Sequence, residues 1–417
     1  MQQAQPSNLP HKPKLRPVEP QLVQYEGGEY ILLRDPLLMS QESVLIPQQL
    51  LPLMAMCDGT RDISSLQSAF QLNTGARLND ETMQDILSQL DEAFLLENGS
   101  YRAAVQVKIY EYREASHRPS SHADLVYPSD PEELASTFAG YVKEAPPVNQ
   151  TDHLPGDLVG MLCPHIDYAR GHKTYAELWE RAKPSLDDIE LVVILGTDHS
   201  GSMGMITPTR QSYATPQGVL PTDTTIVDGL AEVLGQNQAY REEIHHLKEH
   251  SIELASVWLH HYMGRSCPVV PVLCGSFHHF IVGPGYPGET KHITDAIAYM
   301  KEVTKDRRTL IIAAGDLAHI GPAFGDPQPI DTIARAKLTS EDNASLEDFC
   351  KGDADGFLER SRRESDYRRI CGLSPIYLTL KLVGGSVVGE SMGYDQCPAD
   401  ADGGSLVSIA GALLYKA

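Results

Sequence analysis

The sequence predicts an α/β protein in which a large α/β domain follows a smaller N-terminal domain. Several short apolar runs of the large domain are followed by a polar turn and then by residues at helical spacing. This alternation of strand and helix is what α/β layering requires. With 417 residues, the chain is also too long for one typical domain.

The composition is that of a globular protein with an acidic surface. Apolar residues make up 41% of the chain, and 56 acidic residues against 34 basic ones give a formal net charge of −22. Nucleic acids and anionic membranes require a basic surface, so both are disfavoured as main partners. The N-terminus lacks the apolar region of a signal peptide, and no run approaches the length of a membrane span. We therefore expect a cytoplasmic protein.

Four parts are predicted along the chain. Residues 1–20 contain five prolines and no apolar periodicity, which indicates a mobile lead-in. Residues 21–105 form the small domain. Ser/Pro-rich and Pro-Pro stretches indicate a connector over residues 106–150, with a short helix near Pro131–Tyr141. The large domain then covers residues 151–417.

The small domain has the element order of a winged helix-turn-helix. A hairpin over residues 22–33 is followed by three helices, the third capped by Asp80, and Asn98-Gly99 predicts a closing hairpin with a type I′ turn. Residues 21–100 carry twelve acidic residues and three arginines, a net charge of −9. A helix that reads DNA would not have this balance. We expect the domain to bind a peptide or protein, or to pack on the large domain.

Four apolar runs of the large domain each end at a turn that carries histidine. The runs are Leu158–Cys163, Leu191–Leu195, Val269–Cys274 and Thr309–Ala314, and the histidines after them are His165, His199, the pair His278-His279, and His319. Ligands of open α/β sheets collect beyond the carboxyl ends of the strands, so these turns indicate a metal or acid–base site. A single histidine is more often a surface or hydrogen-bonded core residue, but the repeated position favours a site.

We favour His165, His199 and His319 as site residues. The phenylalanines beside His278 and His279 indicate packing or a lid for that pair. A capping box of Thr174 and Glu177 is expected to precede the helical residues that follow the first turn.

Cys371 adds a thiol to these imidazoles. It precedes Gly372 and an apolar helical stretch, and a helix N-terminus favours thiolate, which suits a metal ligand or a nucleophile. A buried structural cysteine is an equally good interpretation on composition alone. The chain has seven cysteines and no C-x-x-C pair, which favours reduced thiols over a disulfide framework or a structural zinc site.

The segment from His246 to His250 matches the H-x-x-E-H pattern of one class of metallopeptidases. That chemistry requires both histidines on one helix. The apolar helical period begins only near Ser251, so His246 is expected to lie outside the helix and the match to be a coincidence.

Five motifs follow one another along the large domain: Pro164-His165-x-Asp167-Tyr168-x-x-Gly171, Gly196-x-x-His199, Glu249-His250-Ser251-Ile252-Glu253, Asp316-x-x-His319 and Cys371-Gly372-x-x-Pro375-Ile376. Their order is that of the Memo family, which the chain resembles over residues 154–417. Five ordered motifs make this resemblance specific. As a whole, the chain resembles AmmeMemoRadiSam system protein B with an additional N-terminal domain.

The resemblance implies the fold of class III extradiol dioxygenases, a mixed sheet sandwiched by helices with the site at one end of the sheet. It also implies metal binding by His165, His199 and Cys371, and catalytic roles for Asp316 and His319, the latter as acid/base. Glu249 and His250 fall in a motif that is implied to line the same cleft. We also expect Asp167, Tyr168 and Asp198 to line it.

Two turns depart from the common family pattern. The first reads His-Ile-Asp-Tyr where an Ala-Gly-Tyr form is frequent, and the second reads Thr-Asp-His-Ser where many members have Ser-His-His. Asp167 and Asp198 thus offer carboxylates, while the main ligand set is kept. We expect iron or copper, with zinc as a further candidate. The thiol of Cys371 makes the site softer than one with two histidines and a carboxylate, which favours copper.

Three functions are compatible with these features. The first is a metal-dependent redox protein, with dioxygenase-like chemistry as one form, or an accessory component of a radical SAM enzyme. The second is a non-catalytic module that binds a peptide or small anion in the cleft. The third is a hydrolase, either with Cys371 as nucleophile and His319 as base or of the H-x-x-E-H type.

The partners follow from the resemblance as well. Its family context implies a radical SAM enzyme and an AMMECR-type protein. The small domain, including its Asp58-Gly59-Thr60 turn, resembles the winged-helix module that recognises precursor peptides in peptide-modifying gene clusters. An acidic surface with an extra module is also compatible with a homodimer.

Overall fold

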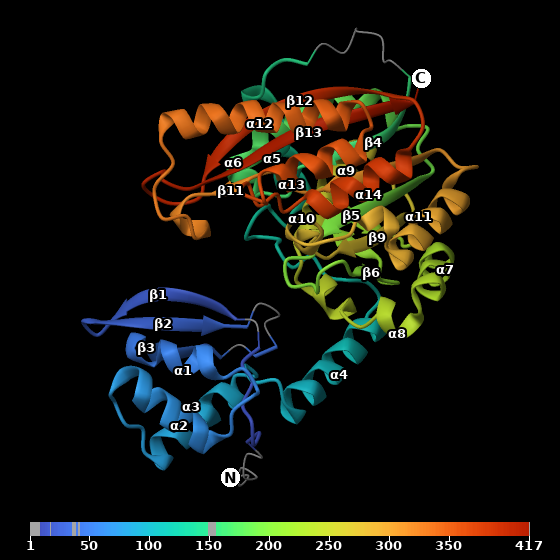
Figure 1. Ribbon diagram of the computed structural model, residues 1–417. Helices are drawn as coiled ribbons and strands as arrows, with labels where there is room; N and C mark the ends of the chain where they lie inside the picture. Colours follow the sequence, from blue (N-terminus) through green and yellow to red (C-terminus); the bar gives the residue numbers. More distant parts are fainter. Residues whose placement is uncertain (1–8, 17, 36–38, 41, 149–155, 417) are drawn as a thin grey trace. The chain divides into compact units, whose positions relative to one another are not determined.

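The computed structural model describes residues 9–416, apart from residues 17, 36–38, 41 and 149–155 (Figure 1). The chain forms two compact units, Met1–Glu114 and Ala115–Ala417. Their boundary falls inside the predicted connector. Helix α4 (Gly99–Glu114) belongs to unit 1, and α5 (Pro131–Glu144), the predicted short helix, belongs to unit 2. The predicted boundary at residue 150/151 lies outside the described residues.

Unit 1 is a small sheet followed by helices. Its strands β1 (Glu19–Tyr25), β2 (Gly28–Arg34) and β3 (Val44–Pro47) form an antiparallel sheet in that order, which confirms the predicted hairpin and adds a third strand. The 3-10 helix η1 (Gln48–Leu50) and helices α1 (Leu51–Met56), α2 (Ile63–Thr74) and α3 (Asp80–Glu92) precede α4. One apolar core joins the sheet to the helices; it includes Leu33, Ile46, Leu53, Leu66, Phe70, Leu87 and Leu90.

The prediction of a second hairpin in the winged helix is wrong. Gly99 begins helix α4 instead, and the side-chain oxygen of Asn98 accepts a hydrogen bond from the backbone N–H of Tyr101 at 3.0 Å. Asn98 therefore acts as a helix cap, a role that asparagine fills as readily as a turn. Leu96 pairs with Leu15 in an antiparallel bridge.

Part of the predicted lead-in is also structured. Residues 1–8 lie outside the described residues, but the backbone N–H of Leu15 donates to Cys57 O at 2.8 Å. Arg16 is buried and forms an ion pair of 3.0 Å with Asp35. Cys57 and Asp35 are distant in sequence from residues 15 and 16. The prediction of a mobile lead-in used only the local proline content, so it could not include these contacts. At α3 the capping residue is Asn79, which accepts from the backbone N–H of Thr82, rather than Asp80.

Unit 2 is built on an eight-stranded mixed sheet. Its strand order is β11-β13-β4-β10-β5-β9-β6, with β12 paired to β13. The strands are β4 (Asp157–Cys163), β5 (Leu191–Thr197), β6 (Ile206–Pro208), β9 (Val269–Cys274), β10 (Thr309–Ala314), β11 (His319–Ile320), β12 (Val387–Pro398) and β13 (Leu406–Lys416). Strands β4, β10, β5 and β9 are parallel neighbours and correspond to the four predicted apolar runs.

Helices cover both faces of this sheet. Leu191, Val193 and Leu195 of β5 belong to one apolar cluster, while Val192 and Ile194 belong to the other, as the alternation of a strand requires. The first cluster contains helices α7 (Thr224–Leu234), α11 (Lys291–Thr304), α12 (Thr332–Cys350), α13 (Ala354–Arg363) and α14 (Leu373–Val383). The second contains α5, α6 (Tyr168–Ala182) and α9 (Ser251–Met263). The predicted mixed sheet between helices is confirmed.

Shorter elements complete unit 2. They are the hairpin β7 (Tyr213–Thr215) and β8 (Gly218–Leu220), helices α8 (Gln236–Ala239) and α10 (His278–Val282), and the 3-10 helices η2 (Lys183–Ser185), η3 (Glu243–Leu247), η4 (Pro287–Glu289) and η5 (Pro322–Phe324). Among the described residues, no helix is both long and apolar enough to cross a bilayer. All seven cysteines are free thiols.

The predicted capping box at Thr174 and Glu177 is wrong. Helix α6 begins at Tyr168, so Thr174 lies inside it. The cap is Asp167, whose carboxylate accepts from the backbone N–H of Arg170 at 3.1 Å. The helix therefore starts three residues after His165, at the edge of the sheet.

Candidate metal centre

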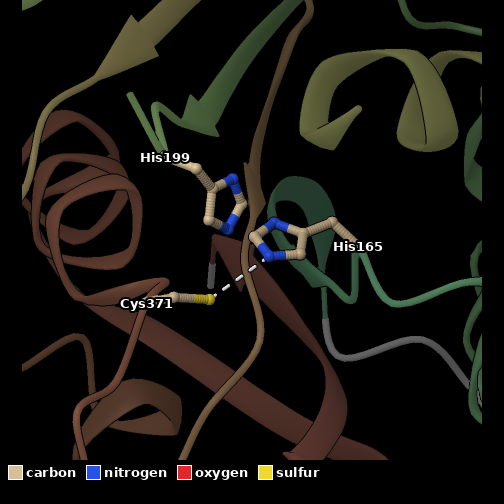
Figure 2. Close-up of side chains that lie close together, drawn as sticks. All are labelled: His165, His199 and Cys371. Carbon is tan, nitrogen blue, oxygen red and sulfur yellow. Dashed lines mark hydrogen bonds between the residues drawn. The ribbon is translucent and has the colours of Figure 1, made fainter. Parts of the chain in front are cut away.

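Two histidines and one cysteine meet at the carboxyl end of the parallel strands. His165 follows β4 and His199 follows β5, and β10 lies between these two strands in the sheet. Cys371 lies two residues before α14. Figure 2 shows the two imidazoles and the thiol turned toward one another. The structure thus brings together the three side chains that the resemblance implied as metal ligands.

The three side chains are close enough to hold one ion. Sγ of Cys371 lies 3.2 Å from Nε2 of His165, and the rings of His165 and His199 are 5.0 Å apart between centroids. One ligand atom from each residue lies within 4.8 Å of the other two. Metal bonds to imidazole and thiolate are about 2.0–2.3 Å long, so this spacing is compatible with a shared ion.

The second nitrogen of each imidazole is held by an acceptor. Nδ1 of His165 lies 3.1 Å from Ala314 O, and Nδ1 of His199 lies 3.0 Å from the carboxylate of Glu249. Both rings therefore present Nε2 to the space beside Cys371. Metal-ligating histidines almost always donate their other N–H in this way, which sets the tautomer and the ring orientation.

Charge at the three groups is strongly coupled. Burial alone would raise the pKa of the Cys371 thiol, but the imidazoles of His165 and His319 and hydrogen bonding to His165 and His199 hold it well below the ordinary value. Burial opposes the protonation of His165, yet Cys371 and Asp316 raise its pKa to about 9. These shifts favour the thiolate of Cys371 and the imidazolium of His165 over the neutral forms. An ion would therefore displace protons as it binds.

Two glycines allow the close approach of the Cys371 segment to strand β10. A Cβ on Gly315 would lie 2.5 Å from Gly372 Cα, and a Cβ on Gly372 would lie 2.7 Å from Asp316 O. The backbone N–H of Gly372 donates to that same oxygen at 3.0 Å. Side chains at either position would push the thiol away from the imidazoles.

Asp316 and His319 lie on the same side of the sheet end. The carboxylate of Asp316 is buried and accepts from the backbone N–H of His165 at 2.8 Å, so it holds the turn that carries this ligand. His319 is partly exposed, and its Nδ1 lies 3.2 Å from Leu317 O. Its imidazole packs against the ring of Phe324. His319 therefore lies at the cleft rather than in the ligand cluster.

A cleft of about 470 Å³ opens over this centre. Its wall includes the predicted residues His165, Asp167, His199, His250, Asp316 and His319. It also includes residues that sequence analysis missed: His122, Val126, Ile166, Arg170, Leu254, Phe324, Ala399 and Val407. His122 comes from the predicted connector, and the sequence carries no pattern that would have marked it.

Three residues predicted in the cleft wall lie behind it. Tyr168 is fully buried and donates to Leu254 O at 2.7 Å. Asp198 is buried, and its carboxylate lies 2.9 Å from Nδ1 of His245. Glu249 is buried behind His199, where it orients that imidazole. Asp167 caps α6, and its carboxylate lies 2.5 Å from Arg170 Nε. The carboxylates of Asp167 and Asp198 therefore do not join the cluster of His165, His199 and Cys371.

The H-x-x-E-H pattern does not form a metal site. His246 lies in η3 and His250 immediately before α9, so the two do not share a helix. His246 is fully buried, its Nε2 lying 2.8 Å from Thr207 O and its Nδ1 2.7 Å from the hydroxyl of Tyr213. Both nitrogens are occupied, which rules out the metallopeptidase interpretation.

Comparisons with known proteins decide the family. A model of the family described as Memo-like protein matches residues 118–413, well over half of the chain. The chain belongs to the Memo family. The match begins at Arg118, so it includes the residues predicted as a connector after the unit boundary at residue 115.

Curated Memo relatives match over different lengths. A MEMO1 family protein of Aquifex aeolicus is 27% identical over 394 residues, which cover 93% of this chain and 96% of that protein. An alignment of that length extends into unit 1. A MEMO1 family protein of Methanopyrus kandleri is 28% identical over 288 residues, covering 66% of this chain and 91% of its own. The similarity of the Aquifex aeolicus protein to this chain thus extends beyond unit 2.

Proposed function

We propose that this Memo protein holds a redox-active transition metal ion, iron or copper, between His165, His199 and Cys371. The observation that supports this most strongly is the orientation of the two imidazoles, each fixed through Nδ1 so that Nε2 faces the thiol. Thiolate and imidazole are ligands that suit copper, iron and zinc. The softness of the thiolate favours copper, and zinc would give a centre without redox activity.

When bound between His165, His199 and Cys371, the ion would supply redox chemistry beside the cleft. The protein's own residues define what can approach it. His319 and His250 place two further imidazoles in the cleft wall, where they can hold or transfer a proton. Arg170 lies at the same wall, paired with Asp167, and its guanidinium can donate a hydrogen bond to a carbonyl group of a substrate. Val126, Leu254 and Phe324 supply apolar surface.

We further propose that the protein acts with partners. Membership of the Memo family supports a radical SAM enzyme and an AMMECR-type protein as those partners. Unit 1, with its acidic surface and three-stranded sheet, is proposed to bind a peptide or protein.

Metal analysis of the full chain purified without chelators tests the central proposal. We expect close to one equivalent of iron or copper in the unmodified protein and a loss of at least tenfold in His165→Ala and Cys371→Ala. The matched controls are His172→Ala and Cys350→Ala, since His172 is a partly buried histidine outside the cleft and Cys350 is a partly buried thiol. Metal content that is equally high in Cys371→Ala, or absent from the unmodified protein after supply of both metals, would contradict the proposal.

A Cys–His hydrolase is the second candidate, favoured by the short distance between Cys371 and an imidazole. The imidazole nearest to the thiol is His165 rather than His319, the predicted base. Iodoacetamide distinguishes the two functions, because a free thiolate reacts at mildly acidic pH whereas a metal-bound thiolate is protected. Labelling of Cys371 that neither metal nor chelator changes would favour the hydrolase.

A further inference from the structure

A second cavity in unit 2 lies apart from the cleft of about 470 Å³ over the proposed metal centre, which we call the metal cleft. The second cavity has a volume of about 590 Å³ and is lined by residues of α12 and α13, by Ile320 of β11, and by Glu364, Tyr367 and Arg368. None of its lining residues belongs to the wall of the metal cleft. Its volume lies within the range of small-molecule sites, about 300–1,000 Å³.

The cavity carries an excess of cations in a strongly acidic protein. Four basic side chains, Lys337, Arg360, Arg363 and Arg368, line it together with two acidic ones, Glu341 and Glu364. The chain as a whole has a net charge of −22. Carboxylates pair with Arg360 and Arg368, so the attraction for an anion within the cavity comes from Lys337 and Arg363.

Two of the four cations are free to bind a ligand. Arg360 is paired with Asp348, and Arg368 is paired with Asp342 and Glu364. Lys337 and Arg363 are exposed, and neither has an ion-pair or hydrogen-bond partner within the described part of the chain. Lys337 on α12 and Arg363 on α13 thus give the cavity two unpaired cations, whose charge equals that of a phosphate monoester dianion.

The buried arginine of the cavity has an unsatisfied donor. Arg368 is 1% exposed; its Nε donates to Glu364 at 2.8 Å and its Nη1 to Asp342 at 2.8 Å. Its Nη2 is buried and has no acceptor among the residues that the structure describes. Buried N–H groups in native proteins are nearly always bonded, so an acceptor from a water molecule or a bound group is expected there.

The segment that lines the cavity has an unusual backbone. Ser365, Asp366 and Arg369 have positive φ angles of 51°, 61° and 47°, although none is glycine. Such conformations persist only where surrounding contacts hold them, and they cluster at ligand sites and switches. One such contact is the backbone N–H of His319, which donates to Arg368 O at 2.7 Å. The same segment continues to Cys371, so it connects the second cavity to the proposed metal ligand.

We propose that this cavity is a binding site for a small phosphate monoester. Lys337 and Arg363 bind the phosphate, and Glu341 accepts hydrogen bonds from hydroxyl or amino groups of the same ligand. Tyr367, which is 48% exposed, offers an aromatic face to a ring. The site is distinct from the cleft over the proposed metal centre, since the two share no lining residue.

Calorimetric titration of the full chain with AMP and with inorganic phosphate, at constant ionic strength, tests the proposal. We expect saturable binding of AMP by the unmodified protein with one site per chain, and weaker binding of phosphate. The double variant Lys337→Ala/Arg363→Ala is expected to bind AMP at least tenfold more weakly. Both side chains are exposed, so the variant should fold normally. Lys173→Ala, which removes another exposed lysine, is expected to bind as the unmodified protein does.

Four results would overturn the proposal. The first is the absence of saturable AMP binding to the unmodified protein. The second is equal AMP affinity in the double variant and the unmodified protein. The third is AMP binding that His199→Ala abolishes while the double variant retains it, because that would place the anion in the metal cleft. Succinate serves as a carboxylate probe, and a higher affinity for succinate than for AMP would contradict the phosphate assignment.

Discussion

Sγ of Cys371 lies 3.2 Å from Nε2 of His165, although 206 positions separate the two residues in the chain. The contact depends on the pairing of β10 with β4 and on the packing of Gly372 against Gly315. Because the thiol and imidazole come from separate segments, the proposed metal centre is sensitive to any change in how these segments approach each other.

Gly372→Ala is expected to damage the metal centre without removing a ligand. Its new Cβ would meet Asp316 O at 2.7 Å, which moves Cys371 away from His165. Overpacking of this kind costs about 1–3 kcal/mol of unfolding free energy. Metal content and urea unfolding measure both effects. The control is Gly140→Ala on α5, where nothing lies within 4 Å of the new Cβ and a stabilisation of up to about 1 kcal/mol is expected. A Gly372→Ala protein with full metal content would contradict this account.

Glu249→Gln is expected to weaken metal binding although Glu249 is not a proposed ligand. Its carboxylate orients His199 through Nδ1, and loss of such a partner typically costs about 10–100-fold in metal affinity. Competition with a chromophoric chelator measures the affinity. Glu144→Gln, which changes a carboxylate paired with His172 on the surface, is the control and should leave the affinity unchanged. Equal affinities in both variants would show that Glu249 has no positioning role.

Acid should destabilise the protein through His246. Burial lowers the pKa of His246 to about 3 in the folded state, whereas an exposed histidine titrates near 6.5. The unfolded state then binds more protons below pH 6.5, so the contribution is complete above that pH and is lost as the pH falls. Between pH 7 and pH 5 the loss is about 2 kcal/mol.

Urea unfolding at pH 7 and pH 5 of the unmodified protein and of His246→Gln checks this prediction. The glutamine can still donate to Thr207 O, but it does not titrate, so its stability should fall by about 2 kcal/mol less over this interval. An identical pH dependence in both proteins would mean that His246 is not the responsible group.

Arg118→Ala is expected to destabilise unit 2 strongly. Arg118 is fully buried, forms an ion pair of 2.6 Å with Glu253, and donates to the backbone oxygens of His246 and Glu249. Removing one partner of a buried pair costs about 3–5 kcal/mol, because the other charge stays buried. Arg210→Ala removes an exposed pair with Asp228, for which about 0–1 kcal/mol is expected. Thermal unfolding of both variants compares the two costs.

Several predictions from the sequence were correct because they depend on local patterns. The parallel strands β4, β5, β9 and β10 are continuous apolar runs, which is what burial on both faces of a sheet requires. The end of such a strand places its turn at the sheet edge, so His165 and His199 could be assigned to one end of the sheet before the strand order was known. The start of α9 at Ser251 likewise followed from its apolar period.

The errors arose where distant partners decided the outcome. Asn98 is a helix cap rather than a turn residue, and Leu96 pairs with Leu15. Residues 115–145, predicted as part of a connector, belong to unit 2, where His122 reaches the cleft wall and its Nδ1 lies 2.9 Å from Glu253. A polar segment resembles a linker in sequence when the residues that it contacts are more than a hundred positions away.

The sequence by itself therefore determined the strands, the sheet edge at which the site lies, and the ordered motifs that mark the Memo family. The tertiary structure decided which polar groups face the proposed metal position and which lie behind those groups. It placed Glu249 behind His199, and it placed His122 in the wall of the cleft. It also buried His246 away from the cleft, where Thr207 O lies next to its Nε2. The physical reason is that a ligand's second hydrogen bond and a cavity's wall are set by contacts across the sheet, which no local pattern encodes.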